Sequence, residues 1–522
     1  MNTLSIIGEQ FRAALHAAHT FRDHLHTERA REEKVHVVGA GGTLTSAYEQ
    51  LRNAAENTEE HLLLQNAIRR FYRQLLLARD RKVLAHSGDE LAVELTLAGY
   101  LKNDDLSISQ IKTINDLAVQ YGHLLDTLRT QRVPSEAALR WVLDMLSVTV
   151  ERELSDHTDA DVFMQFCYEY FRATTDPEKL FKGDVPKDYD IALFMAVHRA
   201  LLKSDPAVIR ADLVRRYQIA LTQPKRFTEM SKHIDEVAAS PLVDKLYRLI
   251  DRQAAPERIV WRMLHEGVDV KTVIENKQVF LSTFEKQVDR EYDQVGGRIK
   301  RAIVRSIIFL FITKVIVGLA IEVPYDYAVH DEIIWLPLIV NLLFPPLYMA
   351  LLSLTLGLPG RANTRALSER ISSVLYTGDT RLHLHAQQTI DGMGSRSFTV
   401  FYTLFGILLI ALISWGLMTI GFSPLHLLIF FIFLSTASFL GFRLSRMVRE
   451  LEVVSSQQSG LTFMRDLFYL PFVVIGRWLS DKYARVNLVT LILDMVIELP
   501  LKTILRLVRQ WAAFINAKKD EI

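Results

Sequence analysis

Polar and ionisable side chains inside long apolar stretches are the residues of this chain that could do chemistry. Lys314 lies near the middle of one such stretch, and Asn341 lies in the next, four residues before a Pro345–Pro346 pair. A charged side chain in a bilayer core costs about 2.5–3.5 kcal/mol on insertion scales and often marks an ion or substrate pathway. A double proline removes two backbone donors and should kink or break its helix, and broken helices line ion sites in transporters. This set predicts a route for a small solute or ion.

Two carboxylates near the C-terminus could partner Lys314. Asp494 and Glu498 lie four residues apart in an apolar segment, so on a helix they share one face. No acidic residue lies in the three other apolar stretches, and pairing with Lys314 would require residues 486–508 to enter the membrane. The alternative is that the long Lys314 stem carries its ammonium group to the interface.

Four apolar stretches must position these residues. They run over about 302–323, 333–358, 398–420 and 425–442, and each is near the roughly 20 residues that a bilayer span requires. Residues 397–442 contain no Asp, Glu, Lys or Arg. The sequence therefore predicts an integral membrane protein with four transmembrane helices.

The basic residues between these stretches predict the orientation of the chain. They all fall on one side of a four-span arrangement, whereas the loops 324–332 and 421–424 hold no Lys or Arg. Cytoplasmic loops carry an excess of basic residues, so both termini are expected to be cytoplasmic, in a bacterial-type cytoplasmic membrane. The basic residues are Arg298, Lys300, Arg301, Arg305, Arg361, Arg365, Arg370, Arg381, Arg396, Arg443, Arg446 and Arg449.

The C-terminal segment 501–516 has the spacing of an amphipathic helix. Lys502, Arg506 and Arg509 fall on one face, and Trp511 lies among the Leu and Ile side chains of the other. A basic face opposite an apolar one is typical of a helix in the membrane interface, where anionic lipid adds about 1 kcal/mol per basic residue. Packing of this helix on protein is the alternative.

The first 295 residues show apolar residues at three- and four-residue spacing and no set of alternating strands, which predicts a helical bundle or array. The segment 37–43 begins like a dinucleotide fingerprint, but Leu44 replaces its third glycine. His16, His19, Asp23 and His26 could share a helix face and bind zinc, or could simply be solvated. The net charge of +1 favours no particular partner, and no catalytic motif is found.

Together these patterns predict an all-α protein in three parts: a soluble multi-helix domain over 1–295, a four-helix transmembrane region over 296–445, and amphipathic helices at the membrane surface over 446–522. The function we expect is that of a non-enzymatic membrane scaffold or anchor without cofactor or metal. Its partners would be lipid, preferably anionic, and another protein or a second copy, but not nucleic acid. The alternative function is transport of a small solute or ion through Lys314 and the Pro345–Pro346 break.

Overall fold

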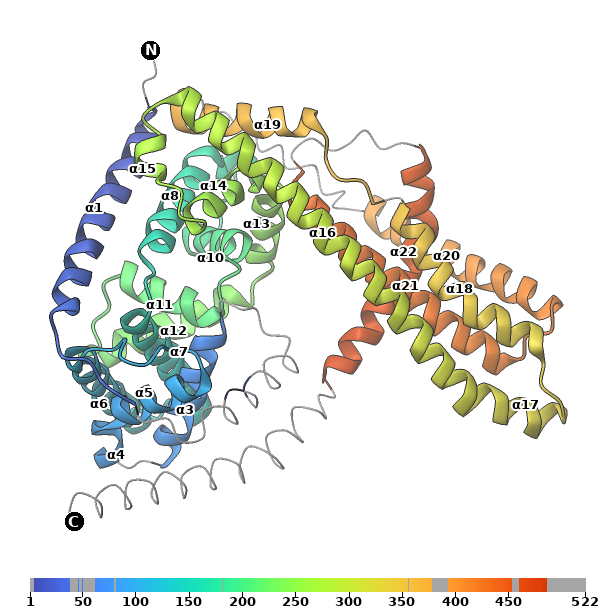
Figure 1. The fold of residues 1–522 in the computed structure, drawn as a ribbon, viewed down its shortest axis with the longest axis horizontal. Helices are drawn as coiled ribbons and strands as arrows, with labels where there is room; N and C mark the ends of the chain where they lie inside the picture. The colour runs from blue at the N-terminus through green and yellow to red at the C-terminus, as the bar shows by residue number, and fades with distance from the viewer. Residues whose placement is uncertain are drawn as a thin grey trace. The chain divides into compact units, whose positions relative to one another are not determined.

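A computed structural model describes residues 4–37, 46, 49, 62–78, 81–181, 183–354, 356–377, 393–452 and 460–485 of this chain (Figure 1). These residues are helical apart from their connections and a single β-bridge between Lys34 and Ser107, which confirms the all-α prediction. The chain divides into two compact units, which are described separately. We call the described residues of 6–250 the helical unit, and the described residues of 1–5 and 251–486 the membrane unit.

The helical unit is a series of short amphipathic helices. Prolines lie in the first turn of several of them, where the missing N–H costs nothing, and Ser107 and Gln110 form a capping box at the start of another. The helices are α1(Ile6–Ala30), α3(Leu63–Ala78), α4(Arg81–Ala85), α5(Ser87–Ala98), α6(Ile108–Thr130), α7(Ser135–Leu154), α8(Thr158–Thr174), α9(Pro177–Leu180), α10(Tyr189–Leu201), α11(Pro206–Arg216), α12(Pro224–Ala238) and α13(Pro241–Asp251).

Helix α7 is the centre of the helical unit and packs against α3, α6 and α11. Val142 and Leu146 of α7 are fully buried. Helix α1 is attached to α8 by Phe11, whose ring stacks on Phe166 at a centroid distance of 4.2 Å. Cys167, beside Phe166, is buried, as its apolar neighbourhood predicts.

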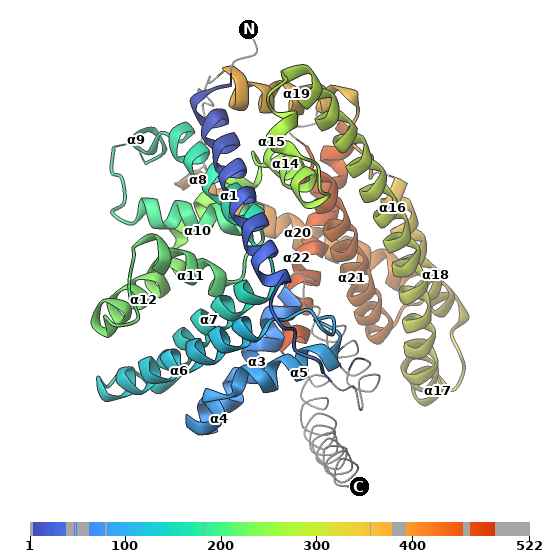
Figure 2. The same ribbon diagram turned by 60° about the vertical axis from the view of Figure 1, so that its left-hand side comes forward.

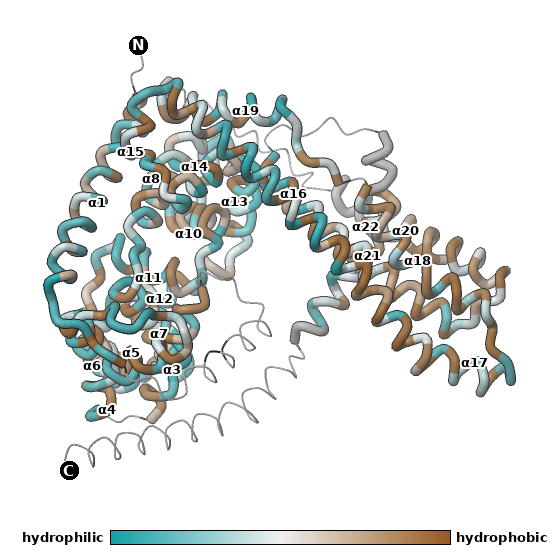
Figure 3. Tube along the Cα trace, viewed as in Figure 1, coloured by the Kyte–Doolittle hydropathy of each residue, from teal (hydrophilic) through white to brown (hydrophobic). Residues whose placement is uncertain are grey.

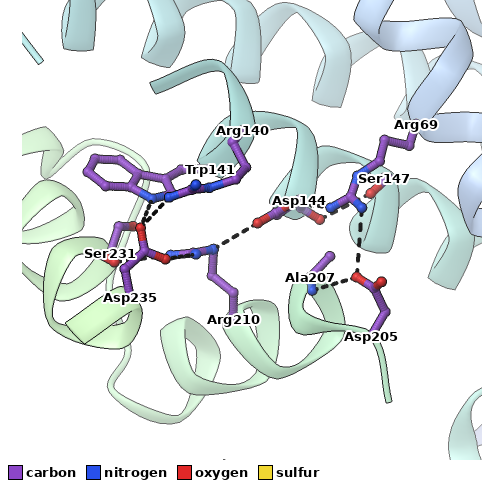
Figure 4. Close-up of polar contacts among 10 residues, drawn as sticks. All are labelled: Arg69, Arg140, Trp141, Asp144, Ser147, Asp205, Ala207, Arg210, Ser231 and Asp235. Carbon is purple, nitrogen blue, oxygen red and sulfur yellow. Dashed lines mark hydrogen bonds and ion pairs between the residues drawn. The ribbon is translucent and has the colours of Figure 1, made fainter. Parts of the chain in front are cut away.

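A chain of buried ion pairs connects four helices of the helical unit (Figure 4). Asp144 of α7 accepts hydrogen bonds from Arg69 of α3 and, at 3.0 Å, from Nε of Arg210 of α11. Arg210 also donates to Asp235 of α12. Burial raises the pKa of Asp144 even though both arginines favour its charged form. Because each charge has an opposite neighbour, the network can be buried without an uncompensated ion.

The membrane unit consists of one very long helix and the helices that pack along it (Figures 1 and 2). Its elements are α14(Ala255–His265), α15(Val270–Val273), α16(Lys277–Val317), the π-helix η2(Gly318–Glu322), α17(Val323–His330), α18(Trp335–Leu354), α19(Arg361–Ser372), the π-helix η3(Ser373–Thr377), α20(Met393–Thr419), α21(Pro424–Arg449) and α22(Gly460–Arg485).

Four of the described helices are long and apolar enough to cross a membrane: 277–330, 335–354, 400–419 and 424–449. Hydrophobic residues dominate α18 and α20 along most of their length (Figure 3). These helices coincide with the four predicted stretches. The first, however, runs on as α16, η2 and α17 to His330, so the prediction of a loop over 324–332 is wrong for most of that segment.

Of the predicted kink or break at Pro345–Pro346, the break is wrong, because α18 is helical through both prolines. Prolines are tolerated in transmembrane helices where neighbouring groups satisfy the freed backbone carbonyls. The transport hypothesis therefore loses one of its two sequence arguments.

Helix α21 is the centre of the membrane unit and packs against α16, α18 and α22. Small residues permit two close approaches. A Cβ on Gly441 would lie 2.0 Å from the Leu352 side chain of α18, and one on Gly476 of α22 would lie 2.3 Å from the Ser435 carbonyl oxygen. Such contacts replace the hydrophobic driving force that is absent between helices in lipid.

Helix α19 and the π-helix η3 lie at the first half of α16 and are held there by hydrogen bonds; we call these two elements the base. Tyr376 at the end of η3 donates to the Ile274 carbonyl at 2.8 Å, and Asn363 of α19 donates to Tyr292 and to the Leu451 carbonyl, each at 2.8 Å. Ser5 bonds to the Val374 carbonyl at 2.7 Å. These bonds connect α19 to α16 and to the segment after α21, and η3 to Ser5 and to the end of α15.

Candidate functional site

Lys314, the sequence candidate in the first span, is 1% exposed and forms an ion pair with Glu322, which is 0% exposed. Its ammonium also lies 5.1 Å from the centre of the Phe433 ring on α21. Lys314 therefore does not reach the interface, and its described partner is Glu322.

The π-helix η2 explains how Lys314 and Glu322 meet. Eight residues separate them, which on a regular α-helix of 3.6 residues per turn places side chains about 80° apart. A π-turn closes i to i+5 hydrogen bonds and so takes about one residue more per turn. The Val323 N–H bonds to the Gly318 carbonyl in this way. The extra residue rotates Glu322 back onto the face of Lys314.

Asn341 of α18, the second candidate, joins this pair to a third helix. Its side-chain nitrogen lies 3.4 Å from the same Glu322 carboxylate oxygen and donates to the His426 carbonyl of α21 at 3.2 Å. The side chain is fully buried. The structure thus brings Lys314 and Asn341 together through Glu322.

Asp326 and His426 form the second half of the site. One carboxylate oxygen of Asp326 accepts from the Ile334 N–H at 3.2 Å, and the other lies 3.5 Å from Nε2 of His426. Nδ1 of His426 lies 2.9 Å from the Ser423 hydroxyl, which caps α21. Both ionisable side chains are 0% exposed. We call Lys314, Glu322, Asp326, Asn341 and His426 the polar cluster.

The polar cluster lies toward one end of the membrane unit and is ordered by depth. At a rise of 1.5 Å per residue, Asp326 lies about 6 Å and Glu322 about 12 Å before His330, where the long helix ends. Lys314 lies about 24 Å from the same residue. His426 begins the first turn of α21, next to Pro424. The Asp326–His426 pair is thus shallow, and Lys314 is deepest.

The net charge of the polar cluster depends on His426. Lys314 compensates Glu322, and Asp326 faces the His426 imidazole, which carries a positive charge only when it is protonated. Four side-chain atoms of the polar cluster are buried without a hydrogen-bond partner in the described structure: Glu322 Oε2, Asp326 Oδ1, Asn341 Oδ1 and His426 Nε2. Buried polar atoms are normally satisfied, so these four atoms are the candidates in the polar cluster for binding a proton or another small ligand.

Sequence reasoning missed Glu322, Asp326 and His426 as members of the site. Glu322 stands at the end of the predicted first span, and Asp326 falls in the predicted loop. The signal that could have found them is helical spacing continued past Pro324, since prolines occur inside transmembrane helices where local π-helical adjustments satisfy the freed backbone groups.

The other predicted site residues lie outside the described part of the chain. These are Asp494 and Glu498 and the membrane-surface set Lys502, Arg506, Arg509 and Trp511. In the helical unit, His19 lies 2.6 Å from Asp159 of α8. No group of three His, Cys, Asp or Glu side chains arranged to hold a metal occurs among the described residues.

Comparisons of this chain with protein-family models, with curated proteins and with solved structures find no match, so the site is interpreted from its own geometry.

Proposed function

We propose that the membrane unit moves a small solute or ion across a bilayer, with the polar cluster as its binding site. The observation that carries the proposal is a Lys–Glu pair, an Asp–His pair and an asparagine, all fully buried where three candidate spans meet. Ionisable residues within transmembrane bundles are expensive and typically serve ion pathways or proton relays.

The polar cluster supports transport of a small solute or ion better than it supports a role in holding the helices together as an anchor. An anchor needs no charge inside the membrane, and interhelical hydrogen bonds there average only about 0.6 kcal/mol. The polar cluster instead keeps acceptor atoms unpaired on three side chains, Glu322, Asp326 and Asn341. Such atoms cost free energy unless a ligand satisfies them.

The test is electrical current from the intact protein reconstituted in vesicles on a solid support, after steps in the concentration of H⁺, Na⁺, K⁺ or small anions. We expect a current in the wild type that Lys314→Leu abolishes. The matched control is Lys300→Leu, the same change at an exposed position of the same helix. Equal currents from the wild type and Lys314→Leu would refute the proposal.

The scaffold hypothesis is retained as a second candidate, because the helical unit has its own buried core and an ion network across four helices. Such a unit can present a fixed surface to a protein partner or to a second copy. In this proposal the basic loops hold both termini in the cytoplasm, next to anionic lipid. Purification of the intact protein in mild detergent tests it: a stoichiometric partner or a stable oligomer is expected, and a monomer without partner would contradict it.

A further inference from the structure

We propose that the ion is a proton and that Asp326 and His426 together form its binding site. The inference rests on the proposed function and names the species that the polar cluster takes. Its starting point is the 3.5 Å approach of Asp326 Oδ1 and His426 Nε2, neither of which has a hydrogen-bond partner in the described structure.

The charge of the polar cluster sets how many protons it can bind before it becomes neutral. Lys314 and Glu322 cancel, and the buried Asp326 carboxylate is left with a neutral imidazole beside it. One proton added to His426 makes an imidazolium that donates to Asp326, so the cluster becomes neutral. Burying an uncompensated ion costs several kcal/mol, and binding one proton removes that cost.

The Ser423 hydroxyl fixes how His426 can take the proton. It accepts the His426 backbone N–H at 3.4 Å, so its own hydrogen is free to donate to Nδ1 at 2.9 Å. The proton balance is simple: neutral His426 carries hydrogen on Nε2, and the added proton enters at Nδ1 while the serine hydroxyl turns to accept. Nε2–H then forms a charge-assisted bond to Asp326.

The titratable and polar neighbours of the pair come from each element packed against it. Glu322 and Lys314 lie deeper on the same long helix, Asn341 bridges from α18, and the Tyr325 ring lies 6.3 Å from the His426 ring. His330, Asp331 and Glu332, where the long helix ends, are exposed to solvent. The route is therefore from this end to Asp326–His426, and then inward toward Glu322.

Release of the proton inward would use the Lys314–Glu322 pair. A proton reaching Glu322 neutralises its carboxylate, which frees Lys314 from its only described anionic partner. Asn341 contacts both Glu322 and the His426 backbone and so positions the two halves against each other. It is a positioning residue, because it carries no titratable proton.

Two measurements on the intact protein in vesicles test the inference. The first follows internal pH with a trapped dye after a potassium diffusion potential is imposed. Asp326→Asn should slow proton entry about 100-fold, as expected for loss of a proton-transfer group. Asp289→Asn, at an exposed position of the same long helix and far from the proposed route, is the matched control and should leave the rate unchanged. Unchanged proton entry in Asp326→Asn, or a sodium current in place of a proton current, would overturn the inference.

The second measurement separates failure of the proton site from failure of transport. Infrared difference spectra between pH 5 and pH 8 contain contributions from the sixteen histidines of the chain, and His426→Gln should remove one of them, even if no flux occurs. Identical difference spectra for the wild type and His426→Gln would overturn the inference even where Lys314→Leu still abolishes current. Should His426→Gln fail to fold by size-exclusion chromatography, Ser423→Ala serves instead. This variant leaves the His426 ring in place and should shift the pH at which the histidine band reaches half of its full change. An unshifted half-change pH counts against the proposal.

Discussion

The buried ion network of the helical unit makes its strongest prediction at Asp144. The side chains of Asp144 and Arg210 are 5% and 4% exposed, and Asp144 contacts two guanidinium groups (Figure 4). Asp144→Asn keeps the shape but removes the one negative charge between Arg69 and Arg210. Removing one partner of a buried pair costs about 3–5 kcal/mol.

The lower end of that range is expected, because both arginines keep a second carboxylate. Arg210 retains Asp235, and Arg69, which is 28% exposed, retains Asp205 at 3.8 Å. A loss of about 3 kcal/mol corresponds to an opening equilibrium about 150-fold larger. Hydrogen exchange of the amides of α7 and α11, measured by mass spectrometry on the intact protein, reports this local free energy.

The matched control is Asp244→Asn. Asp244 pairs with Arg199 at 3.0 Å, but the two side chains are 62% and 40% exposed, so the pair is worth at most about 1 kcal/mol. If Asp144→Asn changes exchange in α7 no more than the control does, the network is not the desolvated structure that its burial implies, and the reasoning fails.

Three further predictions use other parts of the chain. Burial raises the pKa of Glu151 to about 7 from an ordinary 4.5. The folded state thus holds this proton more tightly, so stability of the helical unit should fall as pH rises from about 4.5 to 7 and stay lower above. Glu151→Gln should flatten that profile in hydrogen exchange. Gly476→Ala should lower the melting temperature in detergent by several degrees, because its Cβ would meet the Ser435 backbone, whereas Gly416→Ala, with nothing within 4 Å, should not. A peptide of residues 500–518 should bind anionic liposomes in a sedimentation assay. Changing Lys502, Arg506 and Arg509 of this peptide to Glu should release it, and retained binding would contradict the interfacial helix.

Hydropathy and charge were enough to predict the all-α class and the four apolar helices, because each span is long and its apolar surface faces outward. Lys314 and Asn341 were also recognisable, since a polar residue stands out in an apolar stretch. The contact between Lys314 and Asn341 could not be predicted, because it runs through Glu322. A regular α-helix would place Glu322 on a different face from Lys314. A π-turn contains about one residue more than an α-helical turn, and this extra residue cannot be recognised from the spacing of apolar residues in the sequence.

Proline was misread at two places, each time as an interruption of helix. The segment that begins at Pro324 was predicted to be a loop, and a kink or break was predicted at Pro345–Pro346, yet the chain is helical at both places. Within a membrane bundle, neighbouring groups and local π-helical adjustments can satisfy the carbonyls that a proline leaves without a donor, and η2 lies directly before Val323 and Pro324. Propensity measured in water therefore misleads at membrane depth. Asp326, assigned to solvent on this basis, is buried instead.

The continuous helix 277–330 has a mechanical consequence. Its 54 residues form a rod about 80 Å long, with the Glu322 and Asp326 carboxylates near one end and the base formed by α19 and η3 along the other. A tilt of only about 5° at the end that carries those carboxylates would displace the opposite end by about 7 Å. The rod is thus long enough to act as a lever. A change of a single charge at one end could reach the other as a displacement large enough for a bound molecule to sense.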